Sequence, residues 1–284
     1  MKLSKIFALL LALCLISSAA CAATFTDAHG NVIELDDSLE AYAAVTLVGA
    51  DNAARQGETN LGDLWADALR WFAVSGEINA AFDEDDVKAG NDRIAVDAEH
   101  VVALWNGGNL RADIAEGTFG AEALAEVLPF PNKVAVVYMT GAQLLETLEA
   151  ASQGLPYTAE TADACASLMQ VSGLTYTVDT TKAYDALEAY GDHWFTAGSV
   201  SRVRIDDVNG QPFDAEATYA VVTSNANFNG MDSSYVFKAA AEANEQSAVT
   251  TAVVRDVVFQ FIASELNNQV GEAYAAPQGR LTVL

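Results

Sequence analysis

Three short apolar runs constrain the fold of this 284-residue chain more than any other feature. They have the length and the β-branched content of strands: residues 101–106 (VVALWN), 133–139 (KVAVVYM) and 218–224 (TYAVVTS). Apolar residues at helical spacing predict four helices, at 61–81, 118–128, 140–151 and 251–268. Strands and helices mixed in this order favour an α+β or α/β domain.

The remaining segments add caps and shorter strands. Thr59 or Asn60 is expected to cap the helix at 61–81, and Thr140 the helix at 140–151. Further strands and hairpins are predicted at 168–179, 200–213 and 279–284. Residues 24–37 alternate polar and apolar side chains around Gly30-Asn31, which predicts a hairpin in an extension over 23–44.

The first 22 residues have the pattern of a secretory signal peptide. Lys2 and Lys5 precede an apolar run, and Ala20-Cys21-Ala22 offers a cleavage site. We therefore expect an exported protein that is periplasmic, cell-surface or extracellular. Two alternatives stay open: an uncleaved anchor, and a lipid on Cys21, because SAAC resembles a bacterial lipobox with Ser18 in the place of its leucine.

Acidic residues dominate the charge. The chain has 14 Lys and Arg against 39 Asp and Glu, a formal net charge of -25, and loss of Lys2 and Lys5 with the signal peptide would make it -27. Such a surface repels phosphate backbones, so we expect neither DNA nor RNA as a partner. Only Cys165 follows residue 22, so we expect no intrachain disulfide in the mature protein.

No pattern of a self-contained catalytic site is present. None of His29, His100 and His193 has a histidine or cysteine at metal-ligand spacing, and no nucleophile elbow, Walker loop or dinucleotide fingerprint occurs. We expect no catalytic residue, metal site or cofactor in this chain.

Two of the few arginines lie beside turns or helix starts. Arg55 precedes GETN, and Arg111 follows the glycine turn NGGNL. Guanidinium groups near exposed backbone N–H groups suit a phosphate or a carboxylate. The alternative is local pairing of Arg55 with Glu58 and of Arg111 with Asp113.

Two loop phenylalanines and an aspartate are further candidates. Phe130 lies in the proline-flanked segment EVLPFPN, and Phe228 and Asp232 in SNANFNGMDSS. Two rings can hold a flat base between them, and a carboxylate can accept hydrogen bonds from a ribose. Alternatively, each ring anchors its loop on the core, and Asp232 caps the following helix.

Together these fragments resemble, in order, the C-terminal domain of the 5'-nucleotidase and UDP-sugar hydrolase family. The resemblance covers about residues 45–284. It is carried by RQGETNLGDLWADAL, WNGGNLRADI, LAEVLPFPNKVAVVYMTGAQLLETLE, LMQVSGLTYTVD, VNGQPFDAEATYAVVTSNANFNGMDSSYVF and GRLTVL.

The resemblance implies an α+β domain, a mixed β-sheet with flanking helices, that binds a nucleotide or nucleoside. It implies phosphate and ribose contacts for Arg55, Asn106 and Arg111, base stacking for Phe130 and ribose contacts for Asp232. In the family, a separate metallophosphatase domain supplies two metal ions and the attacking water. Only about thirty residues separate the signal peptide from Arg55, so we expect divalent metals, and hydrolysis, only with a separately encoded metallophosphatase.

Some positions depart from the family pattern. The second stacking position falls on Ala226, and the nearest ring, Phe228, would replace it only if the loop rearranged, because two residues span about 6–7 Å of extended chain. Asn109 replaces a glycine, and Met231 interrupts a glycine-rich turn. Two alternative functions stay open. One is a degenerate protein-interaction or surface module, and the other is a solute-binding protein, which the N-terminal hairpin suggests.

Overall fold

The computed structural model describes residues 23–26, 32–35, 40–82 and 94–284. Its N-terminal strands β1 (Ala23–Thr26) and β2 (Val32–Leu35) pair antiparallel, so the predicted hairpin strands are confirmed. The predicted signal peptide, with Cys21, and the Gly30-Asn31 turn lie outside the described residues.

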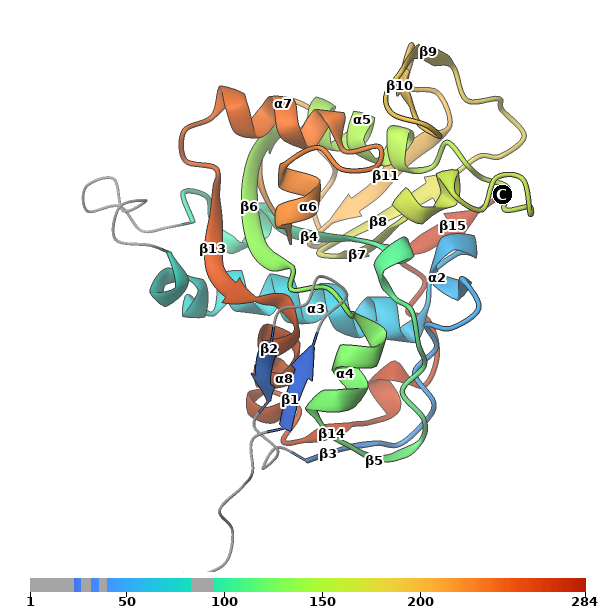
Figure 1. Cartoon of the computed structure of the whole chain (residues 1–284). Coiled ribbons are helices and arrows are strands. Elements are labelled where there is room, and N and C mark those ends of the chain that lie inside the picture. Colours follow the sequence, from blue (N-terminus) through green and yellow to red (C-terminus); the bar gives the residue numbers. More distant parts are fainter. Residues whose placement is uncertain (1–22, 27–31, 36–39, 83–93) are drawn as a thin grey trace, which may run out of the picture.

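A five-stranded mixed sheet forms the centre of the molecule (Figure 1). Its strand order is β13-β6-β12-β4-β7, and β12 runs parallel to β4 while the other neighbours are antiparallel. All three apolar runs are strands, as predicted, and all three belong to this sheet. The bounds are β4 Val101–Asn106, β6 Lys133–Thr140, β7 Met169–Ser172, β12 Thr218–Ser224 and β13 Ala248–Val253.

The sheet is covered on both faces, which explains why its strands are apolar throughout. Along β4, Val101, Ala103 and Trp105 join one apolar cluster, while Val102 and Leu104 join the other. Helices α3 (Asn60–Val74) and α8 (Val254–Ser264) cover the first face, and α5 (Gly141–Ala151) and α7 (Tyr235–Ala243) the second (Figure 1). Mixed sheets with flanking helices confirm the α+β class.

Smaller sheets surround this core. The order β11-β8-β15 joins Val203–Val208, Leu174–Val178 and Leu281–Val283, and β14-β3-β5 joins Gln269–Val270, Ala41–Ala43 and Gly117–Phe119. The hairpin β9 (Ala186–Ala189) and β10 (Phe195–Ala197) projects from the top of the molecule in Figure 1. The short helices are α2 Ala53–Gln56, α4 Ala121–Val127 and α6 Asn225–Phe228, with 3-10 turns at Glu77–Ala81, Ala98–His100, Gly107–Asn109, Ala164–Ser167 and Glu272–Tyr274.

Three predicted helices are shorter than their periodicity suggested. α3 begins after its cap Thr59, whose Oγ1 accepts from the Gly62 N–H at 3.0 Å, but it ends at Val74 because Gly76 has a φ of 85°. The rest of the predicted 61–81 helix is the 3-10 turn Glu77–Ala81.

The other two helices are shorter because the first residues of each predicted segment belong to a strand. The segment predicted as a helix at 118–128 starts within β5, and the one at 251–268 starts within β13 and is helical only over Val254–Ser264. Pairing of β13 with β6 outweighs the local helical pattern. Helix α5 follows its prediction, because Thr140 and Gln143 form a capping box.

A buried carboxylate ties α5 to β11. Glu149 is fully buried and accepts the backbone N–H groups of residues 201–203 at 2.8–3.2 Å. The Arg202 side chain in turn donates to the Ser152 and Leu155 carbonyls. This network satisfies the carbonyl groups at the end of α5 and the N–H groups of residues 201–203.

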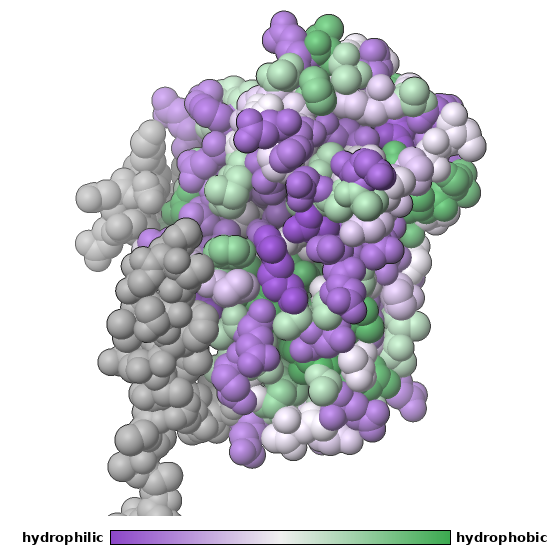
Figure 2. Space-filling model, turned by 45° about the vertical axis from the view of Figure 1, so that its right-hand side comes forward, coloured by the Kyte–Doolittle hydropathy of each residue, from purple (hydrophilic) through white to green (hydrophobic). Residues whose placement is uncertain are grey.

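No helix among the described residues is long and apolar enough to cross a membrane. Hydrophilic residues are spread across the face shown in Figure 2, and they break up the apolar surface there.

Candidate functional site

One edge of the central sheet gathers the candidate residues. Parallel β4 and β12 both end at this edge, and antiparallel β6 and β7 both begin there. The loops that follow or precede these four strands therefore meet. They enclose a pocket of about 710 Å³, lined by Arg55 and by residues from segments 106–111, 130–132, 163–166, 193–194 and 225–232.

The glycine turn brings α2 against this edge. A Cβ on Gly107 would lie 1.9 Å from the Ala54 carbonyl oxygen, and one on Gly108 would lie 2.7 Å from Ala166. Only glycine allows both close approaches. The Gly107 N–H also donates to the Leu168 carbonyl at 2.7 Å. The turn thereby places Arg55, on α2, in the same pocket as Arg111.

The loop that carries Ala162 and Asp163 contacts Arg55. Arg55 Nη1 donates to the Ala162 carbonyl at 2.8 Å and lies 3.8 Å from Asp163 Oδ1. His193 Nε2 lies 3.8 Å from the other oxygen of Asp163. The expected local partner, Glu58, instead accepts the backbone N–H groups of Gln278 and Leu281.

Arg111 stands over an aromatic ring. Its guanidinium carbon lies 5.7 Å from the centre of the Phe130 ring, which is cation–π geometry. Burial and the neighbouring charge of Arg55 lower the pKa of Arg111, while Asp232 opposes the shift. Asp113, the alternative partner of Arg111, is engaged elsewhere. Its Oδ1 accepts the N–H groups of Gly49 and Ala50, both at 2.8 Å. Two guanidinium groups thus share one pocket end.

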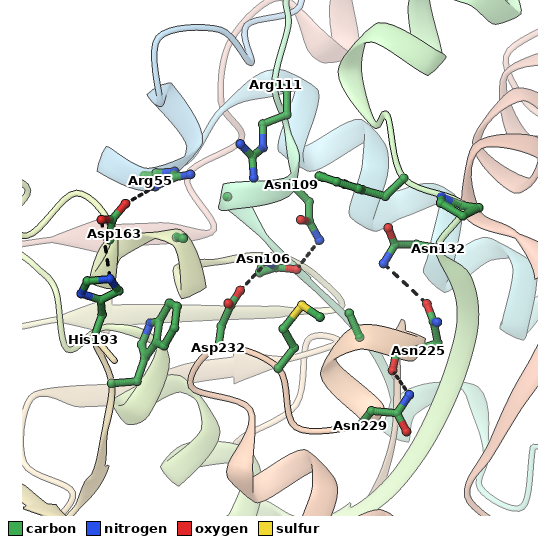
Figure 3. A pocket seen from close by; sticks show the side chains of 17 residues that line it. Arg55, Asn106, Asn109, Arg111, Asn132, Asp163, His193, Asn225, Asn229 and Asp232 are labelled. Atoms are coloured by element: carbon green, nitrogen blue, oxygen red, sulfur yellow. Dashed lines mark hydrogen bonds and ion pairs between the residues drawn. The ribbon is translucent and has the colours of Figure 1, made fainter. Parts of the chain in front are cut away.

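An amide and a carboxylate, Asn106 and Asp232, lie below the two arginines in the view of Figure 3. Asn106 Nδ2 donates to Asp232 Oδ2 at 3.4 Å, and Asn109 Nδ2 donates to Asn106 Oδ1 at 2.9 Å. Burial raises the pKa of Asp232, against the lowering effect of Arg55 and Arg111. Asn109, in the place of a glycine, therefore supports Asn106.

The opposite end of the pocket carries three amides, Asn132, Asn225 and Asn229 (Figure 3). Asn225 Oδ1 accepts the Lys133 N–H at 3.0 Å, so the Asn132 group facing it at 3.5 Å must be the donor Nδ2. This orientation leaves Asn132 Oδ1 buried, with no hydrogen-bond partner among the described residues. An unpaired hydrogen-bond acceptor is therefore present on Asn132, two residues after Phe130 in the chain.

Phe228 does not join the other candidates. It is absent from the pocket lining and packs, half-buried, against the apolar cluster on the α5 and α7 face. The expectation assumed an extended loop, but Asn225–Phe228 is the helical turn α6. Residues two apart on a helix point about 200° apart, so Phe228 turns away while Ala226 lines the pocket.

Several lining residues were not predicted. Asp163, His193 and Trp194 enter from loops distant in sequence from the arginines, and no local pattern marks them. Asn132 and Met231 lie inside fragments that carried the family resemblance. Across the described part of the chain, no group of three or more His, Cys, Asp or Glu side chains could hold a metal ion. The described residues thus form a pocket that is lined by two guanidinium groups and several amides.

The family model of the 5'-nucleotidase C-terminal domain matches residues 40–242. The match covers well over half of the chain, and the chain therefore belongs to this family. The resemblance drawn from the motifs is confirmed.

Individual relatives agree with this assignment. Among curated proteins, the trifunctional nucleotide phosphoesterase protein YfkN of Bacillus subtilis (strain 168) is 29% identical over 208 residues, which cover 72% of this chain and 11% of that protein. The 5'-nucleotidase precursor from Thermus thermophilus is 29% identical, with a TM-score of 0.62 over 86% of this chain and 39% of that one. The Haemophilus influenzae NAD nucleotidase shares the fold at 14% identity, with a TM-score of 0.57 over 92% of this chain and 48% of that one. The chain thus spans less than half the length of each of these relatives.

Proposed function

We propose that this chain is an exported nucleotide- or nucleoside-binding domain, the substrate-binding half of a 5'-nucleotidase system. The observation that carries the proposal is that Arg55 and Arg111 line the same pocket as Phe130 and as the buried amides of Asn106 and Asn132. An anion, a sugar and a flat base are the groups that suit guanidinium groups, polar side chains and an aromatic ring.

The proposed roles follow from the chemistry of each side chain. Arg55 and Arg111 bind the phosphate, because guanidinium groups donate charge-assisted hydrogen bonds to its oxygens. Asp232 and Asn106 bind the ribose hydroxyls, since their 3.4 Å contact is long enough for a hydroxyl to replace it. Phe130 stacks on the base, and its ring already carries Arg111 over one face.

Hydrolysis is proposed to depend on a partner. Hydrolysis of a phosphoester by this family's chemistry uses metal ions to activate water, and the described residues hold no group suited to bind them. A separately encoded metallophosphatase would supply the metals, while this chain positions the nucleotide.

Export is part of the same proposal. Two lysines, an apolar run and a small-residue cleavage site at residues 1–22 support it. Attachment to a membrane is proposed only through a lipid on Cys21. Mass spectrometry of the N-terminal peptide from the host cell would identify the cleavage site and any lipid.

Isothermal titration calorimetry of residues 23–284 with AMP, adenosine and a UDP-sugar tests the binding. Arg55→Ala and Arg111→Ala should each weaken AMP binding about ten- to hundredfold, because hydrogen bonds to charged groups contribute about 1.5–3 kcal/mol. Arg204→Ala is the matched control, since Arg204 is 75% exposed on β11 and pairs with Asp206.

Two outcomes would overturn parts of the proposal. Absence of heat with every nucleotide would remove the binding function and favour the interaction-module alternative. Metal-dependent AMP hydrolysis by the purified chain alone would remove the need for a partner, and a partner-dependent reaction should disappear in the Arg111→Ala variant.

A further inference from the structure

Met231 is an exposed apolar side chain within the pocket. It is 59% exposed, whereas Met139 and Met169 are 2% and 1% exposed. An unbranched apolar side chain left in solvent in a pocket otherwise rich in amides and charges has no role in packing the core. Its position therefore calls for a ligand with an apolar surface.

The backbone around Met231 is tightly held. Its N–H donates to the Ala226 carbonyl at 3.0 Å, and its carbonyl accepts from the Ser234 N–H at 3.0 Å. The flanking Gly230 and Asp232 both adopt left-handed φ, and Tyr190 donates to the Gly230 carbonyl at 2.7 Å. Backbone hydrogen bonds thus hold the turn on both sides of Met231, and the flexible thioether side chain extends from it.

Met231 adjoins the small residue of the same wall. Its hydrogen bond to Ala226 brings the two residues together, and both line the pocket. Alanine leaves the space beside it unfilled, and a methionine side chain is long and adaptable enough to fill it. Residues 226 and 231 therefore form one apolar surface.

This surface and Phe130 belong to two adjoining segments of the pocket lining. Phe130 comes from the segment before β6, and Met231 from the loop after β12. The Asn132–Asn225 contact of 3.5 Å joins the two segments at the amide end. Both side chains line the same cavity.

We propose that Met231 forms the second face of the base-binding slot, so that the flat heteroaromatic base of a nucleoside or nucleotide lies between Phe130 and the Met231 thioether. This inference rests on the proposed function and assigns a residue to recognition of the base. Thioether–aromatic contacts are favourable and tolerate several orientations. Met231 thereby supplies the contact that Phe228, directed into the apolar cluster, does not.

Oxidation of the methionines tests the slot directly. Brief exposure of the mature chain to hydrogen peroxide, followed by peptide mass spectrometry, should oxidise Met231 first, because Met139 and Met169 are buried. AMP at ten times its dissociation constant should slow Met231 oxidation about tenfold, since roughly one molecule in ten remains unbound. Ribose 5-phosphate, which offers the anion and sugar without a base, should leave the oxidation rate unchanged at the same occupancy.

Substitution gives an independent measurement. Met231→Ala should weaken AMP binding about two- to tenfold, in line with the usual strength of sulfur–aromatic contacts, and Met231→Leu should stay within about twofold. Neither change should alter the affinity for ribose 5-phosphate. Val74→Ala, which truncates another exposed apolar side chain outside the pocket lining, should bind AMP as the wild type does.

The outcomes separate this inference from the proposed function. If the wild type binds AMP and Arg111→Ala weakens binding, but bound AMP leaves Met231 oxidation and Met231→Ala affinity unchanged, the slot is wrong and the nucleotide site stands. If the wild type binds no nucleotide or nucleoside, both fall together. Equal protection by ribose 5-phosphate and AMP would also overturn the assignment of Met231 to the base.

Discussion

Asp63, in the first turn of α3, is the carboxyl group that we expect to make the stability of the domain depend on pH. Its side chain is fully buried, and its Oδ2 accepts the Gln278 N–H at 3.0 Å, a donor shared with Glu58 Oε1 at 2.9 Å. Burial raises the pKa of Asp63 to about 8, Glu58 adds to the shift, and Arg280, 3.9 Å from Oδ1, opposes it. Asp63 is therefore protonated in the folded protein at neutral pH.

The sign and size of the effect follow from proton linkage. In the unfolded chain the pKa of an aspartate is about 3.9, so between about pH 4 and pH 8 the folded state holds one proton more. The free energy of unfolding then falls by about 1.4 kcal/mol per pH unit as the pH rises. The stabilisation that Asp63 provides is fully present below about pH 4 and is lost as the pH rises through about 8. It amounts to on the order of 5 kcal/mol of unfolding free energy.

Asp63→Asn removes this titration while keeping the contacts of the protonated acid. The amide oxygen can accept from Gln278, and the amide nitrogen can donate to Glu58. The free energy of unfolding of the variant minus that of the wild type should rise by about 1.4 kcal/mol per unit between pH 5 and pH 8. Urea unfolding at several pH values, followed by tryptophan fluorescence, measures this difference.

An exposed acid provides the control. Glu216→Gln, which makes the same acid-to-amide change at an exposed side chain, is the matched variant. A difference between Asp63→Asn and the wild type that stays constant from pH 5 to pH 8 would refute the reasoning. It would mean that Arg280 keeps Asp63 ionised despite its burial.

Three further substitutions test other parts of the structure. Gly107→Ala should cost about 1–3 kcal/mol of stability and weaken AMP binding, because the new Cβ would displace α2 and the arginine that it carries; urea unfolding and calorimetry measure the two effects. Glu149→Gln should cost about 3 kcal/mol in urea unfolding, since an amide cannot accept all the N–H groups of residues 201–203. Phe228→Ala should lower the melting temperature yet leave AMP affinity within about twofold, and a larger loss of affinity would place its ring in the site after all.

The sequence predicted the centre of the fold well, because burial on both faces gives a strand an unmistakable run of apolar residues. β4, β6 and β12 were located in this way. Helix ends were predicted less well. The break in α3 at Gly76 depends on a left-handed backbone, and the start of α8 depends on pairing of β13 with β6, which is a contact between distant segments.

The candidate site was predictable where a motif carried it. Arg55, Asn106, Arg111, Phe130 and Asp232 come from separate fragments, and the structure brings all five to one pocket. The order of these fragments along the chain indicated a shared site. No single fragment indicated it.

Other features of the site could not be predicted from the sequence, because they depend on how distant segments pack together. Whether a ring at position 228 faces the pocket depends on whether residues 225–228 are extended or helical, and four residues are too few to show a period. The loops that bring Asp163, His193 and Trp194 to the pocket wall form contacts that no local pattern encodes.

The division of the pocket between separate chain segments has a consequence for how such a domain could diversify. The arginine end is built by α2 and the glycine turn, which approach each other closely, whereas the loop at residues 225–232 is a separate segment held by the Lys133 N–H, Asn106 and Tyr190. Exchange of that loop between homologues should therefore change the preferred base and leave the affinity for phosphate intact. A small library confined to these eight positions would be an economical way to retune the domain toward new phosphorylated ligands.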